Sequence, residues 1–301
     1  VWLYTPSGTS SNIKTSRPPR FRGGGQRSRQ RRLYKGLILA LKRTASSEMY
    51  SLNLSTHTPD SMTFNTDNTP VSKTPVPTTF QGTGSQDRAA REAEKRCVGA
   101  VVFAEDWGPA KQFHVLNSLE DVYEYIFSKP EKDRCYYEII WPDKPVKAFV
   151  DLDLKGSSAD MDREEVQIID LFRTKFQEVY GINIESKHVV VLKSDGDISD
   201  GIHKASRHII FKSVYFLNMS HLKAFMGEHI FANLPNETSL DKGVYTSKRN
   251  FRFFGCRKKG SNRVLEHGDT VLSPHSKPHK RVFKNAFVTY PPPNDATLNE
   301  C

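Results

Sequence analysis

The sequence lacks paired cysteines and long apolar runs. Its 4 cysteines, Cys97, Cys135, Cys256 and Cys301, are far apart and form no C-x-x-C pair. Neither a disulfide framework nor a cysteine-based zinc site is therefore predicted, and a reducing compartment is expected. No stretch approaches the ~20 consecutive apolar residues that a membrane helix needs, so a transmembrane protein is excluded and no membrane partner is predicted.

Acidic residues are missing from the first part of the chain. Residues 1–47 hold 11 Lys or Arg and no Asp or Glu, whereas residues 89–301 hold 31 basic and 30 acidic residues. The net charge of +10 therefore comes mostly from this arm. A basic arm of this composition fits a targeting segment, a nucleic-acid-binding arm or a solvated, disordered tail.

Composition also divides the rest of the chain. Residues 48–88 are rich in Ser, Thr and Pro and poor in large apolar groups, which predicts a linker. Apolar density is high from there to about Tyr290, so residues 89–290 are predicted to fold as one domain and residues 291–301 to form a tail. A domain of this size buries on the order of 70% of its unfolded surface and needs no metal or disulfide to fold.

Apolar periodicity within the domain predicts strands and helices without regular alternation. The predicted strands cover residues 99–103, 136–141, 146–154, 188–193, 206–215 and 250–254. Residues 87–97 have a helix-forming composition, and further helices are predicted from Ser118 and over about 162–180 and 220–231. This order of elements predicts a mixed α+β fold.

The first feature with chemical meaning is the segment FVDLDLK, residues 149–155. Side chains alternate along a strand, so Asp151 and Asp153 share one face while apolar residues occupy the other. Neighbouring carboxylates repel each other, and a divalent cation or ample water relieves the repulsion. A D-x-D pair also occurs at solvated strand ends, but the apolar residues around this one favour a central strand.

The second feature is HKASRHIIF, residues 203–211. The same two-residue period places Lys204, Ser206 and His208 on one face. An ammonium group, a hydroxyl group and an imidazole in a row can donate several hydrogen bonds to a phosphate. The alternative is a strand that begins with polar residues and holds His208 in the core.

The third feature is residues 239–260, in which Asp241 is the single acid and four aromatic residues are interleaved with basic ones. Basic residues among aromatics suit a phosphate-rich ligand. Residues 241–290 carry 12 bases and 3 acids, whereas residues 89–240 carry 19 bases and 25 acids, so the domain is polarised. The basic residues of the segment are Lys242, Lys248, Arg249, Arg252, Arg257, Lys258 and Lys259.

Together, these features supply three carboxylates and a row of phosphate donors, which fits two-metal phosphoryl or nucleotidyl transfer. The same set fits a two-metal nuclease or phosphodiesterase, and a non-catalytic nucleic-acid-binding module is a third hypothesis. The excess of cationic donors favours polymerisation, because a leaving pyrophosphate needs more neutralisation than one scissile phosphate.

The motifs resemble those of the archaeo-eukaryotic primase superfamily, and most closely those of its eukaryotic primase-polymerase family. That family has D-x-E or D-x-D, then S-x-H, then a later Asp, which correspond here to Asp151/Asp153, Ser206/His208 and Asp241. The stretch LDKGVYTSKRNFRFFGCRKKG is similar to the family's third motif, with G-V-Y-T and R-N-F-R in the same order and spacing. The resemblance covers residues 98–268.

The resemblance implies a role for each matching residue. The catalytic and metal-binding carboxylates would be Asp151, Asp153 and Asp241, which would hold two divalent cations, Mg²⁺ or Mn²⁺. The nucleotide-binding residues would be Lys204, Ser206, His208, Arg252, Lys258 and Tyr137. Tyr137, expected near the nucleotide sugar, also fits plain strand packing. Further candidates for nucleic-acid contacts are Lys248, Arg249, Arg257 and Lys259.

The resemblance also implies an architecture and an activity. The fold would be α+β, with two mixed α/β modules, the second like the RNA-recognition sheet fold, facing each other across an active-site cleft. The activity would be that of a DNA-directed primase-polymerase in replication restart, repriming or damage tolerance. Its partners would be a DNA template and primer, nucleoside triphosphates and single-strand-binding proteins, and it would reside in the nucleus or the mitochondrial matrix of a eukaryote and not be secreted.

The chain departs from the family pattern in two places. Asp153 stands where the nearest relatives have Glu, which leaves the choice between Mg²⁺ and Mn²⁺ open. No Cys/His cluster follows Gly260 beyond His267, His275 and His279, so the zinc module that relatives use in priming is not predicted. The sequence therefore supports primer extension more than priming.

Overall fold

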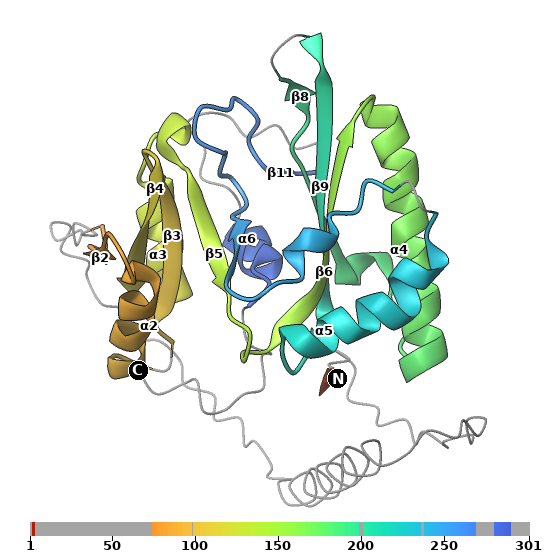
Figure 1. Cartoon of the computed structure of the whole chain (residues 1–301), viewed down its shortest axis with the longest axis horizontal. Coiled ribbons are helices and arrows are strands. Elements are labelled where there is room, and N and C mark those ends of the chain that lie inside the picture. The colour runs from red at the N-terminus through yellow and green to blue at the C-terminus, as the bar shows by residue number, and fades with distance from the viewer. Residues whose placement is uncertain are drawn as a thin grey trace, which may run out of the picture. The chain divides into compact units, whose positions relative to one another are not determined.

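Two antiparallel sheets, which we call sheet A and sheet B, form the domain (Figure 1). We describe them from a computed structural model, in which the described residues are 2–3, 74–97, 99–198, 201–235, 238–268 and 280–289. The predicted tail, most of the basic arm and the first part of the predicted linker lie outside these residues. None of the described helices is long and apolar enough to cross a membrane.

Sheet A is built around β9 (His203–Phe216), a strand of 14 residues. β6 (Val146–Lys155) and β7 (Val189–Lys193) pair antiparallel with β9. The shorter strands of this sheet are β1 (Trp2–Leu3), β8 (Gly196–Asp197) and β11 (Glu266–His267). β6 and β9 are buried on both faces over much of their length, which explains their nearly continuous apolar runs.

Two helices pack on one side of sheet A. α4 (Ser158–Tyr180) begins at the N-cap Ser157, whose hydroxyl accepts from the Asp160 N–H, and ends at Gly181, whose φ of 70° suits a glycine. The ring of Phe172 in α4 stacks on Phe211 of β9 at 4.6 Å. α5 (Met219–Phe225) continues as a π-helical turn over Met226–Ile230.

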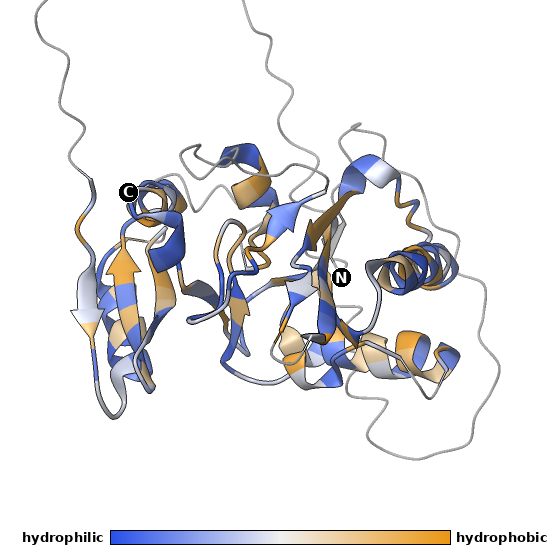
Figure 2. Ribbon diagram, turned by 90° about the horizontal axis from the view of Figure 1, so that it is seen from above, coloured by the Kyte–Doolittle hydropathy of each residue, from blue (hydrophilic) through white to orange (hydrophobic). Residues whose placement is uncertain are grey.

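Sheet B has the strand order β10-β5-β3-β4-β2. Its strands are β2 (Thr78–Phe80), β3 (Val101–Trp107), β4 (Ala110–Leu116), β5 (Tyr136–Ile140) and β10 (Arg249–Arg252). α2 (Ser85–Lys95) packs on the face that carries Val102 and Ala104. α3 (Leu119–Phe127) packs on the opposite face, where Phe103 lies. Hydrophilic and hydrophobic residues alternate along both the helices and the strands (Figure 2).

A continuous core joins the two sheets. The chain passes from β5 of sheet B into β6 of sheet A through residues 141–145 and returns to sheet B at β10. Phe251 of β10 packs edge-on against Phe149 of β6 at 4.9 Å, and the Tyr245 hydroxyl donates to the Phe149 carbonyl at 2.9 Å. The segment that carries the third chemical feature is therefore anchored against the strand that carries the first.

Two buried ionisable side chains hold α6 (Lys280–Ala286) and the residues after it. The Lys147 ammonium donates to the carbonyls of Lys284, Asn285 and Phe287, and the Glu138 carboxylate accepts from the Val288 and Thr289 N–H groups. Burial raises the pKa of Glu138 to about 7 and lowers that of Lys147 to about 7, and each charge partly offsets this shift in the other.

The α+β prediction is confirmed, and every predicted strand is present within a few residues of its predicted bounds. β2 and β4 were not predicted. β2 and the first turn of α2 lie within the predicted linker of residues 48–88, because backbone pairing of Thr78–Phe80 with β4 does not require an apolar sequence. The predicted helix over 220–231 begins at Met219 and changes to π and 3₁₀ turns after Phe225.

Candidate functional site

The register between β6 and β9 brings the first two predicted motifs together. Asp151 lies opposite His208, and Asp153 lies opposite Ser206. Opposed residues of an antiparallel pair point to the same face of the sheet. Sheet A therefore has one face that carries both carboxylates and both members of the S-x-H motif, and we call it the carboxylate face.

Asp241 reaches the same face through a short backbone pairing. The Asp153 N–H donates to the Ser239 carbonyl at 2.8 Å, and the Asp241 N–H donates to the Asp151 carbonyl at 2.8 Å. Leu152 and Leu240 form the bridge between them. Asp241 is thereby placed next to Asp151, although 89 positions separate them in the sequence.

The Asp241 side chain caps the 3₁₀ turn Lys242–Val244, since its Oδ1 accepts from the Gly243 N–H at 2.7 Å. A Cβ atom at position 243 would come within 2.9 Å of that oxygen. The glycine in the D-K-G-V stretch therefore lets Asp241 hold its own backbone turn. The remaining oxygen, Oδ2, lies 3.6 Å from the Arg249 guanidinium.

Asp151 experiences an excess of negative charge. Burial and the nearby carboxylates of Asp153 and Asp241 raise the pKa of Asp151 to about 7, against the opposing effect of the cations of Arg252 and Lys258. A carboxyl group that is hard to ionise in the free protein gains most from a nearby cation.

The pKa of Asp153 is lowered, whereas that of Asp151 is raised. Burial alone would raise its pKa, but hydrogen bonds from the Ser206 hydroxyl to Oδ1 and from the Lys204 ammonium to Oδ2 outweigh burial and lower the pKa. The Lys204 bond is 2.9 Å long. Two of the predicted phosphate donors are thus in contact with a predicted metal ligand.

His208 is buried and neutral. Burial and the charges of Arg252 and Lys258 hold its pKa well below the ordinary value. Its ring stacks on Phe251 with centroids 4.0 Å apart, and its Nε2 lies 3.7 Å from Asp151 Oδ1. Its Nδ1 is buried without a hydrogen-bond partner. An imidazole fixed in this way can still accept or donate one hydrogen bond.

Arg252 lies at the end of β10 and is also buried. One terminal nitrogen, Nη1, donates to the Ser194 hydroxyl and to the Arg263 carbonyl, each at 3.3 Å, whereas Nε has no partner. Partial desolvation and the neighbouring cations Arg252 and Lys204 lower the pKa of Lys258, which Asp153 and Asp151 partly restore. The charges of Arg252 and Lys258, which were predicted to contact phosphate, therefore oppose the rise in the pKa of Asp151, and that of Lys258 also lowers the pKa of Asp153.

Tyr137 lies opposite Arg252 in sheet B. Its hydroxyl donates to the Asp106 carboxylate, and the Lys111 ammonium lies 3.8 Å from its ring centroid. Burial and the Asp106 carboxylate raise the pKa of this phenol. The ring is fixed beside Arg252 by contacts within its own sheet.

The four weaker candidates for nucleic-acid contacts differ in their surroundings. Arg249 approaches Asp241, as noted above. Lys248 forms an exposed ion pair with Asp87, and Arg257 pairs with Glu131. Lys259 is exposed, and its backbone N–H donates to Asp106. The charges of Lys248 and Arg257 are therefore compensated away from the carboxylate face.

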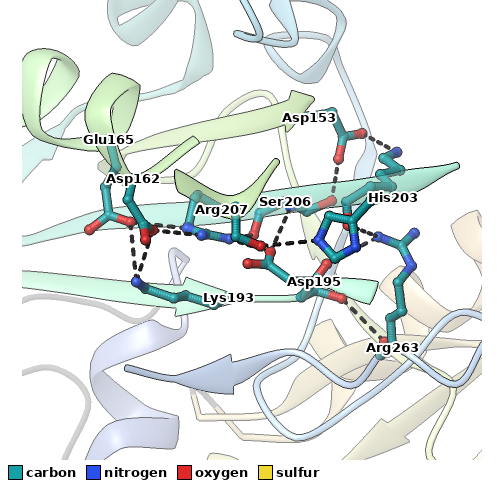
Figure 3. Close-up of polar contacts among 12 residues, drawn as sticks. Asp153, Asp162, Glu165, Lys193, Asp195, His203, Ser206, Arg207 and Arg263 are labelled. Carbon is teal, nitrogen blue, oxygen red and sulfur yellow. Dashed lines mark hydrogen bonds and ion pairs between the residues drawn. The ribbon is translucent and has the colours of Figure 1, made fainter. Parts of the chain in front are cut away.

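A turn that sequence analysis missed lies beside Ser206, at the end of β7. Arg252 and Arg263 donate to Ser194 of this turn. Arg207 donates to the next residue, Asp195 (Figure 3). The only sequence signal is the polar K-S-D-G-D stretch, residues 193–197, between two strands. Such a stretch ordinarily marks a solvated turn, yet Ser194 is almost fully buried.

The oxygen donors present suit a hard divalent cation such as Mg²⁺ or Mn²⁺. Within the described part of the chain, no three His, Cys, Asp or Glu side chains are arranged as a ready metal site. Burial and, in addition, repulsion from Asp153 and Asp241 nonetheless raise the pKa of Asp151 to about 7, and a cation would neutralise this repulsion. These oxygen donors therefore fit a divalent cation. In the free protein, Asp153 instead accepts from Lys204 and Ser206, and Asp241 accepts from the Gly243 N–H.

Comparison with known proteins gives relatives of one kind. No protein-family profile matches the chain. A putative helicase/primase complex protein of African swine fever virus is 29% identical over 166 residues, which cover 50% of this chain and 16% of the viral protein. A DNA-directed primase/polymerase protein of Danio rerio is 24% identical over 232 residues, which cover 60% of this chain and 43% of that protein. Over about half of its length, the chain is similar to proteins named as primases or polymerases.

A second African swine fever virus isolate has a protein of the same name that is 27% identical over 176 residues, or 17% of its length. The chain thus spans about a sixth of these viral relatives and less than half of the zebrafish one.

Proposed function

We propose that this domain is a DNA-directed primase-polymerase. It would join a nucleotide to the 3′-hydroxyl of a primer on a DNA template, with attack of that hydroxyl on the α-phosphate of a nucleoside triphosphate and release of pyrophosphate. The observation that carries the proposal is the carboxylate face, on which three carboxylates and the S-x-H motif meet in register. The relationship to proteins named as primases and polymerases supports it.

Asp151, Asp153 and Asp241 would hold the divalent cations. When bound, such ions lower the pKa of the attacking hydroxyl and neutralise charge on the phosphates. The pKa of Asp151, raised to about 7 by burial and its neighbouring carboxylates, supports this assignment, because a bound cation would keep this group ionised at neutral pH.

The cations and hydrogen-bond donors around the carboxylates would bind the triphosphate. Lys204 and Ser206 contact Asp153 in the free protein and can turn to phosphate oxygens once cations occupy the carboxylates. His208 Nδ1 and Arg252 Nε are buried polar atoms without partners, and a phosphate could satisfy both. Tyr137 would flank the sugar, beside Arg252.

Primer extension assays test the proposal. The wild-type protein is expected to lengthen a labelled primer on a template in Mg²⁺ or Mn²⁺ and only when a nucleoside triphosphate is present. Asp151→Asn should fold and fail to extend. Shortening of the labelled strand without triphosphate would instead support a nuclease that uses the same carboxylates.

A third outcome is salt-dependent DNA binding that persists after substitution of all three Asp residues and occurs without any extension. That result would favour a non-catalytic nucleic-acid-binding module. Omitting the primer in a parallel reaction separates priming from extension.

A further inference from the structure

A buried arginine lies behind the carboxylate face. Arg207 sits between Ser206 and His208 in β9, so its side chain points to the opposite face of sheet A, toward α4. The side chain is fully buried, and its three guanidinium nitrogens all donate to carboxylates (Figure 3). The acceptors are Asp162, Glu165 and Asp195, at 2.7 Å for Asp162 and 3.0 Å for Glu165.

Asp195 differs from the two helix carboxylates because it also contacts the backbone of β9. The same oxygen that accepts from Arg207, Oδ1, accepts from the Ser206 N–H at 3.2 Å. Arg207 Nη1 also donates to the Ser206 carbonyl at 2.9 Å, as does the Ser194 N–H at 3.1 Å. The Ser206 N–H is therefore bonded to Asp195, and the Ser206 carbonyl is bonded to Arg207 and Ser194.

Ser206 links Arg207 and Asp195 to the carboxylate face. The hydroxyl of Ser206 donates to Asp153 Oδ1 on that face, while its backbone is bonded to Asp195 and Arg207 behind it. Burial would raise the pKa of Asp195, but hydrogen bonds and charge from Arg207 outweigh it, so Asp195 stays ionised. A continuous set of hydrogen bonds thus runs from Arg207 through Asp195 and Ser206 to Asp153.

A second arginine fixes the turn that carries Asp195. Arg263 Nη1 donates to the carbonyls of Ser194 at 3.0 Å and Lys204 at 3.3 Å. Gly196 admits this side chain, because a Cβ atom there would lie 3.0 Å from Arg263 Cγ, and its φ of 148° is one that L side chains rarely adopt. The turn is therefore held against β9 from both sides, which makes Asp195 a rigid support.

We propose that Asp195, oriented by Arg207, is a positioning residue for nucleotide binding. It sets the position of the Ser206 backbone, and with it the hydroxyl that faces Asp153 and the triphosphate. The inference rests on the proposed function for the identity of the ligand, but the contacts on which it depends lie within the free protein.

Glu165 provides a matched control for Asp195. Both carboxylates accept from Arg207, but Glu165 makes no described contact with the β9 backbone. If the cluster serves stability alone, Glu165→Gln and Asp195→Ala should have similar consequences. If Asp195 positions Ser206, only the substitutions at 195 should affect nucleotide binding.

The experiment compares Asp195→Ala, Asp195→Asn and Glu165→Gln in primer extension, with nucleotide and DNA concentrations varied separately. Asp195→Ala is expected to raise the KM for nucleotide about tenfold with unchanged DNA affinity, while Glu165→Gln stays within about twofold. Asp195→Asn keeps an oxygen that can accept from the Ser206 N–H, so it should recover part of the loss and also serves if Asp195→Ala does not fold.

Amide hydrogen exchange of the free protein provides a readout that does not depend on activity. The Ser206 amide is expected to exchange faster in Asp195→Ala than in Glu165→Gln and wild type. Equal nucleotide KM values for the two variants, or unchanged exchange at Ser206, would overturn the inference. Lack of extension by the wild-type protein would count against the proposed function instead, and the exchange comparison would still decide whether Asp195 positions Ser206.

Discussion

Two clusters of charged side chains lie on opposite faces of β9, and they differ in how completely their charges are compensated. The rear cluster consists of Arg207, Asp162, Glu165 and Asp195. The front cluster is the carboxylate face with its neighbours: Asp151, Asp153, Asp241, His208 and Arg252. Behind the strand, every guanidinium nitrogen of Arg207 has a carboxylate partner. In front of it, His208 Nδ1 and Arg252 Nε are buried without partners. Natural proteins satisfy nearly all buried polar groups, so these two unpaired atoms beside a row of carboxylates support the proposed ligand site.

The pKa values show the same difference. Behind β9, Arg207 lowers the pKa of Asp162 and Asp195 despite the opposing effect of burial. In front, burial and like charge raise the pKa of Asp151 to about 7, and burial with nearby cations lowers that of His208. Burial still raises the pKa of Glu165 in the rear cluster, and Ser206 and Lys204 lower that of Asp153 in the front cluster. The unfavourable charge is therefore concentrated at Asp151, where a cation would relieve it.

The largest expected effect comes from removing the charge of the front cluster. Asp151→Asn should reduce primer extension by about 10³-fold or more, because a ligand of the divalent cations that neutralise the reacting phosphates is lost. Its melting temperature should stay the same or rise, since the variant removes a repulsive carboxylate. Asp170→Asn, the same change on the exposed side of α4, should retain full extension, and a Asp151→Asn protein as active as this control would contradict the assignment.

Breaking the rear cluster should instead destabilise the fold. Arg207→Met removes a fully buried guanidinium that three carboxylates share. Asp162 is half exposed and Lys193 still pairs with Asp162 and Glu165, so we expect a loss of about 1–3 kcal/mol in the free energy of unfolding. Urea denaturation measures it. The exposed pair of Arg163 with Asp160 supplies the control, because Arg163→Met should cost less than about 1 kcal/mol.

Divalent cations should act on the front cluster in a pH-dependent way. The raised pKa of Asp151 favours its protonated form in the folded state, so its contribution to stability is complete below pH 3.8 and is lost as the pH rises through about 7. Mn²⁺ or Mg²⁺ should therefore raise the melting temperature by a few degrees at pH 8 and by less at pH 5.5. The same titration of Asp151→Asn should show little cation effect at either pH.

The smallest effect is expected at Lys248, whose charge is compensated far from both clusters. Its ion pair with Asp87 is exposed, so Lys248→Ala should change the free energy of unfolding by less than about 1 kcal/mol. Primer extension should stay within twofold of wild type. A strong loss of DNA affinity in this variant would show that Lys248 leaves Asp87 to contact a phosphate.

Strand periodicity predicted much of the front cluster before any coordinates. The alternation of Asp151 with Leu152, and of Ser206 with Arg207, was sufficient to place the motif residues on common faces. Periodicity could not show that Asp151 and Asp153 lie on the same face of the sheet as Ser206 and His208. That depends on the register between β6 and β9, which pair across some fifty residues. The contribution of Asp241 depends on a three-residue backbone bridge that has no local sequence pattern.

The missed features share a different physical cause. β4 was not predicted because its buried positions include Gln112 and His114, which hides the alternation of apolar and polar residues. His114 is satisfied by Glu105 at 2.9 Å and by Thr79 at 2.9 Å. Arg207 and Asp195 were not predicted as site residues, because a buried ion cluster is defined by partners that are distant in the sequence.

The contacts of Lys147 and Glu138 have a consequence for how the protein is made. Glu138 lies in β5 and Lys147 in β6, two consecutive strands that leave the ribosome well before their partners, residues 284–289. Until those residues emerge, at about 5–20 residues per second, a nascent chain would have to bury a carboxylate and an ammonium without their backbone partners. We therefore expect the two strands to stay loosely packed during synthesis and the domain to close in one late step, when α6 leaves the exit tunnel.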